Sequence, residues 1–254
     1  MNVAVVQSNI SNENRNLNVA RYEKMLGSLE THPDLIVLPE MFNVGFGPNL
    51  QEYAVRYGND DVEFLKSLSK NFSSPVVGST AIAENGNVYN RLFWVSDDVV
   101  EGRYDKRHLF FGDEKNVCKS GDNKMVVECC GMKFLPLICY DVRFPLWSRN
   151  YYVSDDFMFD CIVYIANFPS LRIDVLKVLA KARAIENQCY VIVVNRVGEN
   201  GNGELHCGGS MFVNYDGEIL AEAKDDGEQV LSYNLCKEKL VAYRNKFPVY
   251  KDWD

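Results

Sequence analysis

Short apolar runs recur along the chain, and several of them are apolar at every position. They cover residues 2–7, 34–39, 75–83, 91–96, 133–139, 161–167 and 189–197. A run of this kind predicts a β-strand in a sheet that is covered on both faces. The dipeptides Asn85-Gly86 and Asp97-Asp98, and the stretch NYDGEI at residues 214–219, predict antiparallel hairpins.

Segments with apolar residues near helical spacing separate some of these strands. The first lies between the first two strands and contains Leu17, Ala20, Leu26 and Leu29; the others cover residues 62–68 and 173–187. Alternating strands and helices, together with hairpins, predict an α/β fold with mixed sheets. Because no linker rich in proline or glycine divides the chain, and no internal repeat is found, we expect a single domain over residues 1–254.

Charge and composition exclude some classes of function. Of the 254 residues, 47% are hydrophobic and 24% are charged, as in ordinary globular proteins. The net charge of −8 argues against a nucleic-acid-binding face, which needs clustered lysine and arginine, and against an anionic membrane surface. The apolar runs are too short for a transmembrane span, and the N-terminus lacks the basic flank of a secretory signal.

The cysteines and histidines predict neither disulfides nor a metal site. Eight cysteines are scattered through a chain without an export signal, which predicts reduced thiols and a cytoplasmic protein. No CxxC motif occurs, and His32, His108 and His206 are far apart in the sequence. We therefore expect no metal and no cofactor.

Chemically reactive side chains follow three of the predicted strands, as is typical of α/β folds. Glu40 ends the second strand, Lys106 follows a hairpin, and Cys139 ends the fifth strand. Each also has an ordinary explanation. A buried cysteine is usually an inert core residue, Glu40 could cap the next segment, and Lys106 could be a surface charge.

Taken together, these segments resemble a known family. The motifs LPEMF (38–42), YDKRHLF (104–110) and CYDVRFP (139–145), in this order, resemble the three catalytic motifs of the nitrilase superfamily, the carbon–nitrogen hydrolases. The resemblance continues through ANFP (166–169), ARAIENQCYV (182–191) and NRVGENGNGELHCGGS (195–210). CYDVRFPLWSRN and ARAIENQ most resemble the omega-amidase branch, which hydrolyses terminal amides of 2-oxo acids. This implies a four-layer α-β-β-α sandwich with two mixed sheets, assembled as a homodimer.

The resemblance also assigns roles at the reacting end of the substrate. Cys139 is the expected nucleophile, and Glu40 is the expected general base. Lys106 is expected to lower the pKa of the Cys139 thiol and to stabilise the oxyanion together with the backbone N–H of Tyr140. Glu114 matches a second glutamate of the family, which positions the substrate or the lysine.

At the other end of the substrate, the resemblance implies that Arg143 binds a carboxylate bidentately. Phe168 matches a pocket position of the family. Phe46 stands where other omega-amidases carry tyrosine, and Leu176 stands where relatives usually carry tryptophan. Both departures bear on the substrate more than on the type of reaction.

Several alternatives remain open at this point. Asp141 is interpreted as structural, because a carboxylate beside the nucleophile opposes thiolate formation unless it is neutralised, most simply by Arg143 or by a backbone N–H. A papain-like pair of Cys139 and His108 lacks the supporting motif, and the other cysteines are expected in the core. The leading hypothesis is an omega-amidase acting on 2-oxoglutaramate or 2-oxosuccinamate. The alternatives are an N-carbamoyl amino acid hydrolase, a nitrilase, or a non-catalytic scaffold.

Overall fold

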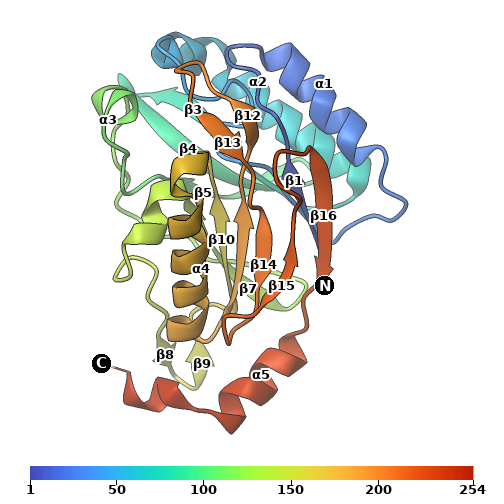
Figure 1. The fold of residues 1–254 in the computed structure, drawn as a ribbon, viewed down its shortest axis with the longest axis vertical. Coiled ribbons are helices and arrows are strands. Elements are labelled where there is room, and N and C mark those ends of the chain that lie inside the picture. The colour runs from blue at the N-terminus through green and yellow to red at the C-terminus, as the bar shows by residue number, and fades with distance from the viewer. Residues whose placement is uncertain (254) are drawn as a thin grey trace.

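The computed structural model describes residues 1–253 of the chain, leaving aside the side chain of Asp113. Two six-stranded mixed sheets pack face to face (Figure 1). The first sheet has the strand order β16-β1-β2-β3-β4-β5, in which the pairs β1–β2 and β2–β3 are parallel. Its strands are β1 (Asn2–Gln7), β2 (Leu35–Val37), β3 (Val76–Glu84), β4 (Asn87–Ser96), β5 (Val99–Asp105) and β16 (Gln229–Asn234).

The second sheet has the order β15-β14-β11-β10-β7-β6, in which β10 is parallel to both β7 and β11. Its strands are β6 (Val127–Cys129), β7 (Met132–Ile138), β10 (Cys161–Ile165), β11 (Tyr190–Val194), β14 (Met211–Val213) and β15 (Ile219–Glu222). Two small hairpins add β8 (Tyr152–Val153) with β9 (Asp156–Phe157), and β12 (Val197–Glu199) with β13 (Leu205–Cys207).

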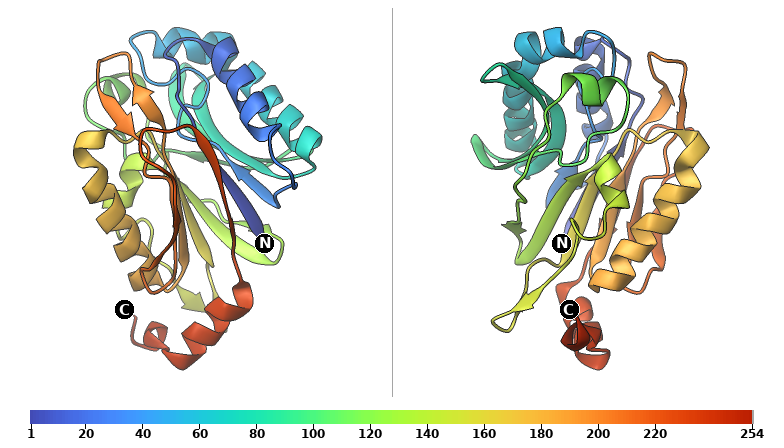
Figure 2. Two further views of the ribbon diagram at one scale, coloured as in Figure 1. Left: turned by 45° about the vertical axis from the view of Figure 1, so that its right-hand side comes forward. Right: turned by 90° about the vertical axis from the view of Figure 1, so that its left-hand side faces the viewer.

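Helices cover the two outer faces of this pair of sheets, which gives four layers (Figure 2). The helices α1 (Arg15–Leu26) and α2 (Leu50–Phe72) cover the first sheet, and α4 (Ile173–Asn187) covers the second. The remaining helices are α3 (Asp113–Val117), α5 (Lys237–Lys246), η1 (Cys139–Arg143), η2 (Ser170–Arg172) and η3 (Val249–Asp252). In residues 1–253, no helix is both long and apolar enough to cross a lipid bilayer.

The largest apolar core lies between the sheets and continues beneath α4. Trp94 of β4 meets Phe134 of β7 there, with 5.4 Å between the ring centroids. A second core joins the first sheet to its helices through residues such as Tyr22, Phe64 and Leu65. Burial on both faces explains why these strands are apolar at nearly every position.

The predicted strands and hairpins are confirmed, with shifted ends. Both Asn85-Gly86 and Asp97-Asp98 connect antiparallel strands, and the stretch 214–219 leads from β14 into β15. The helix predicted at residues 62–68 is instead 23 residues long and begins at Leu50. Its polar middle conceals the pattern, because Gly58 packs closely against Ile82 of β3 and the buried Asp61 accepts hydrogen bonds.

Candidate active site

The three reactive side chains singled out in the sequence lie where strands of both sheets end. Glu40 follows β2, Lys106 directly follows β5, and Cys139 opens η1 directly after β7. The parallel register of β7 and β10 then places the residues after β10 beside Cys139. Because the two sheets pack face to face, side chains from distant parts of the sequence meet in one site.

Lys106 lies between two buried carboxylates. Its Nζ is 2.7 Å from Glu40 Oε1, 2.8 Å from Glu114 Oε2 and 2.9 Å from Glu114 Oε1. None of the three side chains is more than 4% exposed. Two ionised carboxylates and one ammonium leave one uncompensated negative charge, so this cluster needs further hydrogen-bond donors to remain ionised.

Amide groups supply those donors. The side chain of Asn90 donates to Glu40 Oε1 and to Glu114 Oε1, at 2.8 Å in each case. The backbone N–H of Asn167 donates to Glu40 Oε2 at 2.9 Å, and that of Phe110 donates to Glu114 Oε2 at 2.8 Å. Each carboxylate is thus fixed by contacts from more than one element.

This environment determines the protonation states of the cluster. Burial raises the pKa of Glu40, because it outweighs the lowering effect of Lys106, and the charge of Glu114 adds to the rise. Burial alone would lower the pKa of Lys106, but the charges of Glu114 and Glu40 raise it well above its usual value. Lys106 is therefore an ammonium, and Glu40 is a stronger base than an exposed glutamate.

Cys139 is held as a buried thiol at a strained position. Its side chain is 8% exposed, and its φ of 44° lies in the left-handed region that residues other than glycine rarely adopt. Burial, reinforced by the charge of Glu40, raises the pKa of Cys139 well above its usual value. Lys106 lowers this pKa, as expected from the sequence, but by less. At rest Cys139 is therefore a thiol, and its proton has to be removed before the sulfur acts as a nucleophile.

The backbone after Cys139 offers an oxyanion donor. Tyr140 is the second residue of η1. The first N–H groups of a helix have no carbonyl partner within it. The N–H of Tyr140 thus lies next to Cys139 in the chain, and its role as an oxyanion donor stays a prediction.

These groups open into one cavity of about 460 Å³. Glu40, Lys106, Glu114, Cys139 and Tyr140 all contribute to its lining. Its walls also include the aromatic side chains at positions 46, 110 and 168, and residues 200–204 between β12 and β13. The cavity is large enough for a small organic substrate and offers it both apolar and polar walls.

Of the residues expected to bind the substrate, some line the cavity and others do not. Phe168 and Phe46 both line the cavity, and the ring centroid of Phe46 is 5.9 Å from Lys106 Nζ. Arg143 is half-buried against the ring of Tyr140 and is not part of the lining, whereas Arg172 is. Leu176 is fully buried in the core beneath α4, so its departure from tryptophan acts on packing rather than on the cavity wall.

Asp141 has a structural role, as interpreted from the sequence, and of the two partners considered there the structure shows backbone N–H groups and not Arg143. Its carboxylate is fully buried and accepts hydrogen bonds from the Tyr104 hydroxyl at 2.6 Å and from the Ile138 N–H at 3.1 Å. It also accepts from the backbone N–H and from Nδ1 of His108, at 3.0 and 2.8 Å. His108 is therefore engaged by Asp141 and stacks on Phe144.

Three residues of the site were not identified from the sequence: Asn90, Asn167 and Arg172. Asparagine is depleted in strands, so the buried Asn90 inside β4 was a usable signal. Asn167 lies within the motif ANFP, where only Phe168 was singled out. Arg172 follows that motif by three residues and had no signal of its own.

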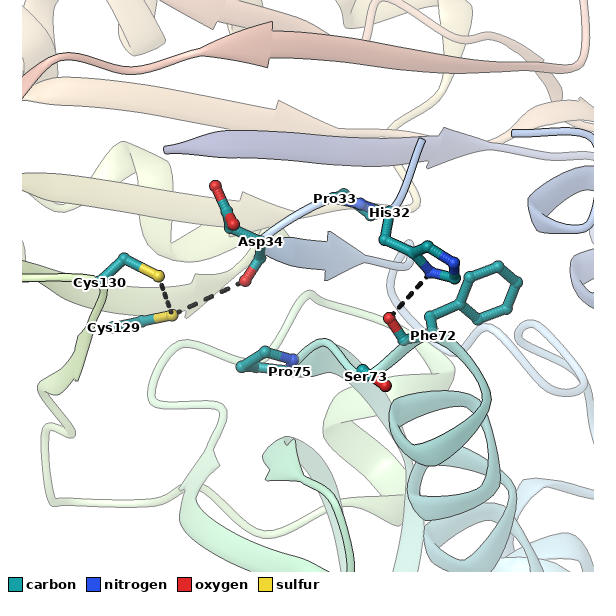
Figure 3. A pocket seen from close by; sticks show the side chains of 8 residues that line it. All are labelled: His32, Pro33, Asp34, Phe72, Ser73, Pro75, Cys129 and Cys130. Carbon is teal, nitrogen blue, oxygen red and sulfur yellow. Dashed lines mark hydrogen bonds between the residues drawn. The ribbon is translucent and has the colours of Figure 1, made fainter. Parts of the chain in front are cut away.

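A second hollow, of about 430 Å³, lies away from these residues and is lined by Cys129, Cys130, His32 and their neighbours (Figure 3). The sulfur atoms of Cys129 and Cys130 are 3.9 Å apart. All eight cysteines lie within the described residues and are unpaired. The prediction that the other cysteines are core residues is confirmed for three of them and is wrong for the exposed Cys130 and the half-buried Cys129, Cys207 and Cys236.

Comparison with known proteins connects this geometry to a family. The family model described as carbon-nitrogen hydrolase matches residues 2–245. Omega-amidase YafV of Yersinia enterocolitica is 39% identical, over 93% of this chain and 90% of that protein. The 2-oxoglutaramate amidase of Bacillus subtilis (strain 168) is 31% identical, over 98% of this chain and 96% of that protein.

A solved structure supports the same assignment. XC1258 from Xanthomonas campestris is described as a CN-hydrolase superfamily protein with an arsenic adduct in the active site. It is 32% identical and has a TM-score of 0.94, with 100% of this chain and 97% of that chain covered. Family model, relatives and fold agree, and this chain belongs to the carbon-nitrogen hydrolase family.

Proposed function

We propose that this protein is an omega-amidase. It hydrolyses the terminal amide of 2-oxoglutaramate or 2-oxosuccinamate to the 2-oxo dicarboxylate and ammonia. The observation that carries this proposal is the buried Cys139 thiol beside the cluster of Glu40, Lys106 and Glu114, inside a cavity of about 460 Å³. The relatives named omega-amidase YafV and 2-oxoglutaramate amidase support the choice of substrate.

In the first half of the reaction, a thioester forms and ammonia leaves. Glu40 takes the proton of the Cys139 thiol while the sulfur attacks the amide carbonyl. Because burial raises the pKa of this thiol, the attack depends on a base that removes its proton. The Lys106 ammonium and the Tyr140 N–H stabilise the oxyanion that develops; a single such donor is worth roughly 10²–10³ in rate. The protonated Glu40 then gives its proton to the departing amine as the carbon–nitrogen bond breaks.

In the second half, water hydrolyses the thioester. Glu40, again a carboxylate, accepts a proton from the water as its oxygen attacks the thioester carbonyl. The same two donors receive the second oxyanion. Collapse of this intermediate breaks the carbon–sulfur bond, and the proton held by Glu40 returns to the Cys139 sulfur. The products are one carboxylic acid and one ammonia for each water consumed.

Glu114 acts on this reaction through Lys106. Its two oxygens hold the ammonium at 2.8 and 2.9 Å, so the Nζ atom faces the cavity in one position. Preorganised charge of this kind needs no rearrangement as the oxyanion forms. Glu114 is therefore proposed as a positioning residue.

We also propose that the protein is a homodimer and that it is cytoplasmic. Val178 and Ile185 on α4 are 65% and 51% exposed, and their spacing of seven residues places them on one face of the helix. Such a face is typical of a surface that is covered in an oligomer. The eight unpaired cysteines support a reducing compartment.

The proposed function predicts release of ammonia from 2-oxoglutaramate by the wild-type protein and none by Cys139→Ala. Cys130→Ala is the matched control: it removes an exposed thiol far from the cavity and should retain full activity. An enzyme-coupled ammonia assay on the three proteins makes the measurement. Equal release by wild type and Cys139→Ala would exclude the thioester mechanism. A wild type inert toward 2-oxo acid amides would exclude the proposed substrate.

A further inference from the structure

The substrate proposed above carries a carboxylate at the end opposite its amide, and this anion needs a cationic partner in the cavity. Among the residues that the structure describes, Lys106 and Arg172 are the cations that line it. Lys106 is already held by two carboxylates. Its charge is therefore committed to the reacting end, and only Arg172 remains for the distal carboxylate.

Arg172 is positioned for this role by an aromatic side chain. It is half-buried, and its guanidinium carbon is 5.2 Å from the centroid of the Phe110 ring. Within the described residues its side chain makes neither a salt bridge nor a hydrogen bond. The cation–π contact holds the guanidinium without using its N–H donors. Those donors are free to bind a carboxylate bidentately.

The path from Lys106 to Arg172 follows one wall of the cavity. Lys106 contacts Glu114, the backbone N–H of Phe110 donates to Glu114 Oε2 at 2.8 Å, and the ring of Phe110 contacts Arg172. The two cations are thus connected through Glu114 and Phe110, which also line the cavity. A short amide acid can place its amide at Cys139 and its carboxylate at Arg172.

The segment that carries Arg172 also offers a donor nearer the nucleophile. Asn167 is 9% exposed and lines the cavity, and its side-chain nitrogen has no hydrogen-bond partner among the residues that the structure describes. Buried polar groups without a partner are rare. The segment from 167 to 172 therefore carries two donor groups that line the cavity and have no partner within residues 1–253.

Arg143, the residue expected from the sequence, is placed less favourably. Its guanidinium carbon is 5.9 Å from the ring of Tyr140, and it is outside the cavity lining. The rings of Tyr140 and Phe110 meet edge to face, with centroids 5.2 Å apart. The two arginines therefore lie against different members of one aromatic pair, and only Arg172 reaches the cavity.

Resting on the omega-amidase function, we infer that Arg172, rather than Arg143, binds the substrate carboxylate, and that the Asn167 side chain donates to a substrate oxygen between that carboxylate and the amide.

Steady-state kinetics of Arg172→Gln, Arg143→Gln and wild type test this inference, using 2-oxoglutaramate and a neutral aliphatic amide. Loss of a charged hydrogen-bonding partner should raise KM for 2-oxoglutaramate by about 10- to 100-fold in Arg172→Gln. The neutral amide should be hydrolysed as by wild type, and Arg143→Gln should leave both substrates nearly unchanged. Arg172→Lys keeps the charge but not the bidentate geometry, so its KM should be intermediate.

The outcomes separate this inference from the proposed function. A selective rise in KM in Arg143→Gln, or equal effects of Arg172→Gln on both substrates, would overturn the assignment while leaving the omega-amidase function intact. If wild type instead hydrolyses N-carbamoyl amino acids, the proposed function fails. The same comparison with that carboxylate-bearing substrate still decides whether Arg172 binds the anion. Thermal unfolding followed by circular dichroism confirms that each variant is folded.

Discussion

A single amide side chain bridges the two carboxylates of the site. The Asn90 nitrogen donates to both Glu40 and Glu114, which would otherwise share only the charge of Lys106. Hydrogen bonds to a buried carboxylate favour its ionised form. Asn90 therefore opposes the burial that raises the pKa of Glu40.

Replacing Asn90 by alanine should move the acidic limb of the pH–rate profile to higher pH. Glu40 must be ionised to act as the base, and without this donor its already raised pKa rises further. One hydrogen bond to a charged group is worth about 1.5–3 kcal/mol, which corresponds to a shift of about one pH unit or more. The measurement is kcat/KM against pH for wild type and Asn90→Ala.

Asn87→Ala is the matched control for this experiment. Asn87 lies on the same strand, but among the described residues its side chain donates only to the nearby Asn85 carbonyl. Its profile should coincide with that of wild type. An acidic limb at the same pH in Asn90→Ala and wild type would show that Asn90 does not set the pKa of the base.

At the scale of elements, Asp141 joins the connection after β5 to the start of η1. It accepts from Tyr104 and His108 on one side and from Ile138 on the other. The first two residues precede or follow Lys106 closely, and the third precedes Cys139. This carboxylate thus fixes the ammonium-bearing segment relative to the nucleophile.

Asp141→Asn should lower both stability and turnover. Asparagine replaces one carboxylate oxygen by an NH2 group, which cannot accept hydrogen bonds. Some of the donors from Tyr104, Ile138 and His108 therefore lose their acceptor. Each buried donor left unsatisfied costs about 1–3 kcal/mol. Denaturant unfolding and kcat on a neutral amide measure the two effects. Asp174→Asn, at an exposed position in the first turn of α4, should change neither. If Asp141→Asn is destabilised but its kcat is unchanged, Asp141 contributes to stability and not to turnover.

Elements with a clear period could be predicted from the sequence, and those shaped by tertiary contacts could not. The buried strands and their hairpins follow from apolar runs and turn residues. The length of α2 was underestimated because Gly58 and Asp61 interrupt the apolar pattern of the helix. Both residues contact β3 instead, Gly58 by close packing and Asp61 by a hydrogen bond. The strand β16 shows only a weak alternation of polar and apolar residues, and the helix α5 has only a weak apolar face. Neither element was predicted from the sequence.

The site divides in the same way. Cys139, Glu40 and Lys106 could be singled out by ordered motifs, but their meeting depends on how the two sheets pack. The role of Asn90 depends on the register of β4 and β5, in which the Lys106 N–H donates to the Asn90 carbonyl at 3.0 Å. The placement of Arg143 and Arg172 depends on the course of η1 and η2. Neither register nor packing is contained in a motif.

At the scale of the whole molecule, the contact between the two sheets determines whether the site exists, since each sheet carries only part of it. Trp94 and Phe134 lie at this contact, one from each sheet. Trp94 is fully buried, and within the described residues its indole N–H has no hydrogen-bond partner. An unpaired buried donor costs free energy that the apolar part of the ring has to offset.

Trp94→Ala and Trp94→Phe should therefore differ sharply in stability. Removing the whole ring leaves a cavity between the sheets and should cost about 3–5 kcal/mol of unfolding free energy. Phenylalanine keeps most of the contact with Phe134 and removes the unpaired N–H, so its cost should be well below that. Urea unfolding followed by far-ultraviolet circular dichroism measures both, with an unchanged m-value as the check on two-state behaviour. Equal destabilisation by the two substitutions would mean that the indole itself, and not the buried apolar contact, holds the sheets together.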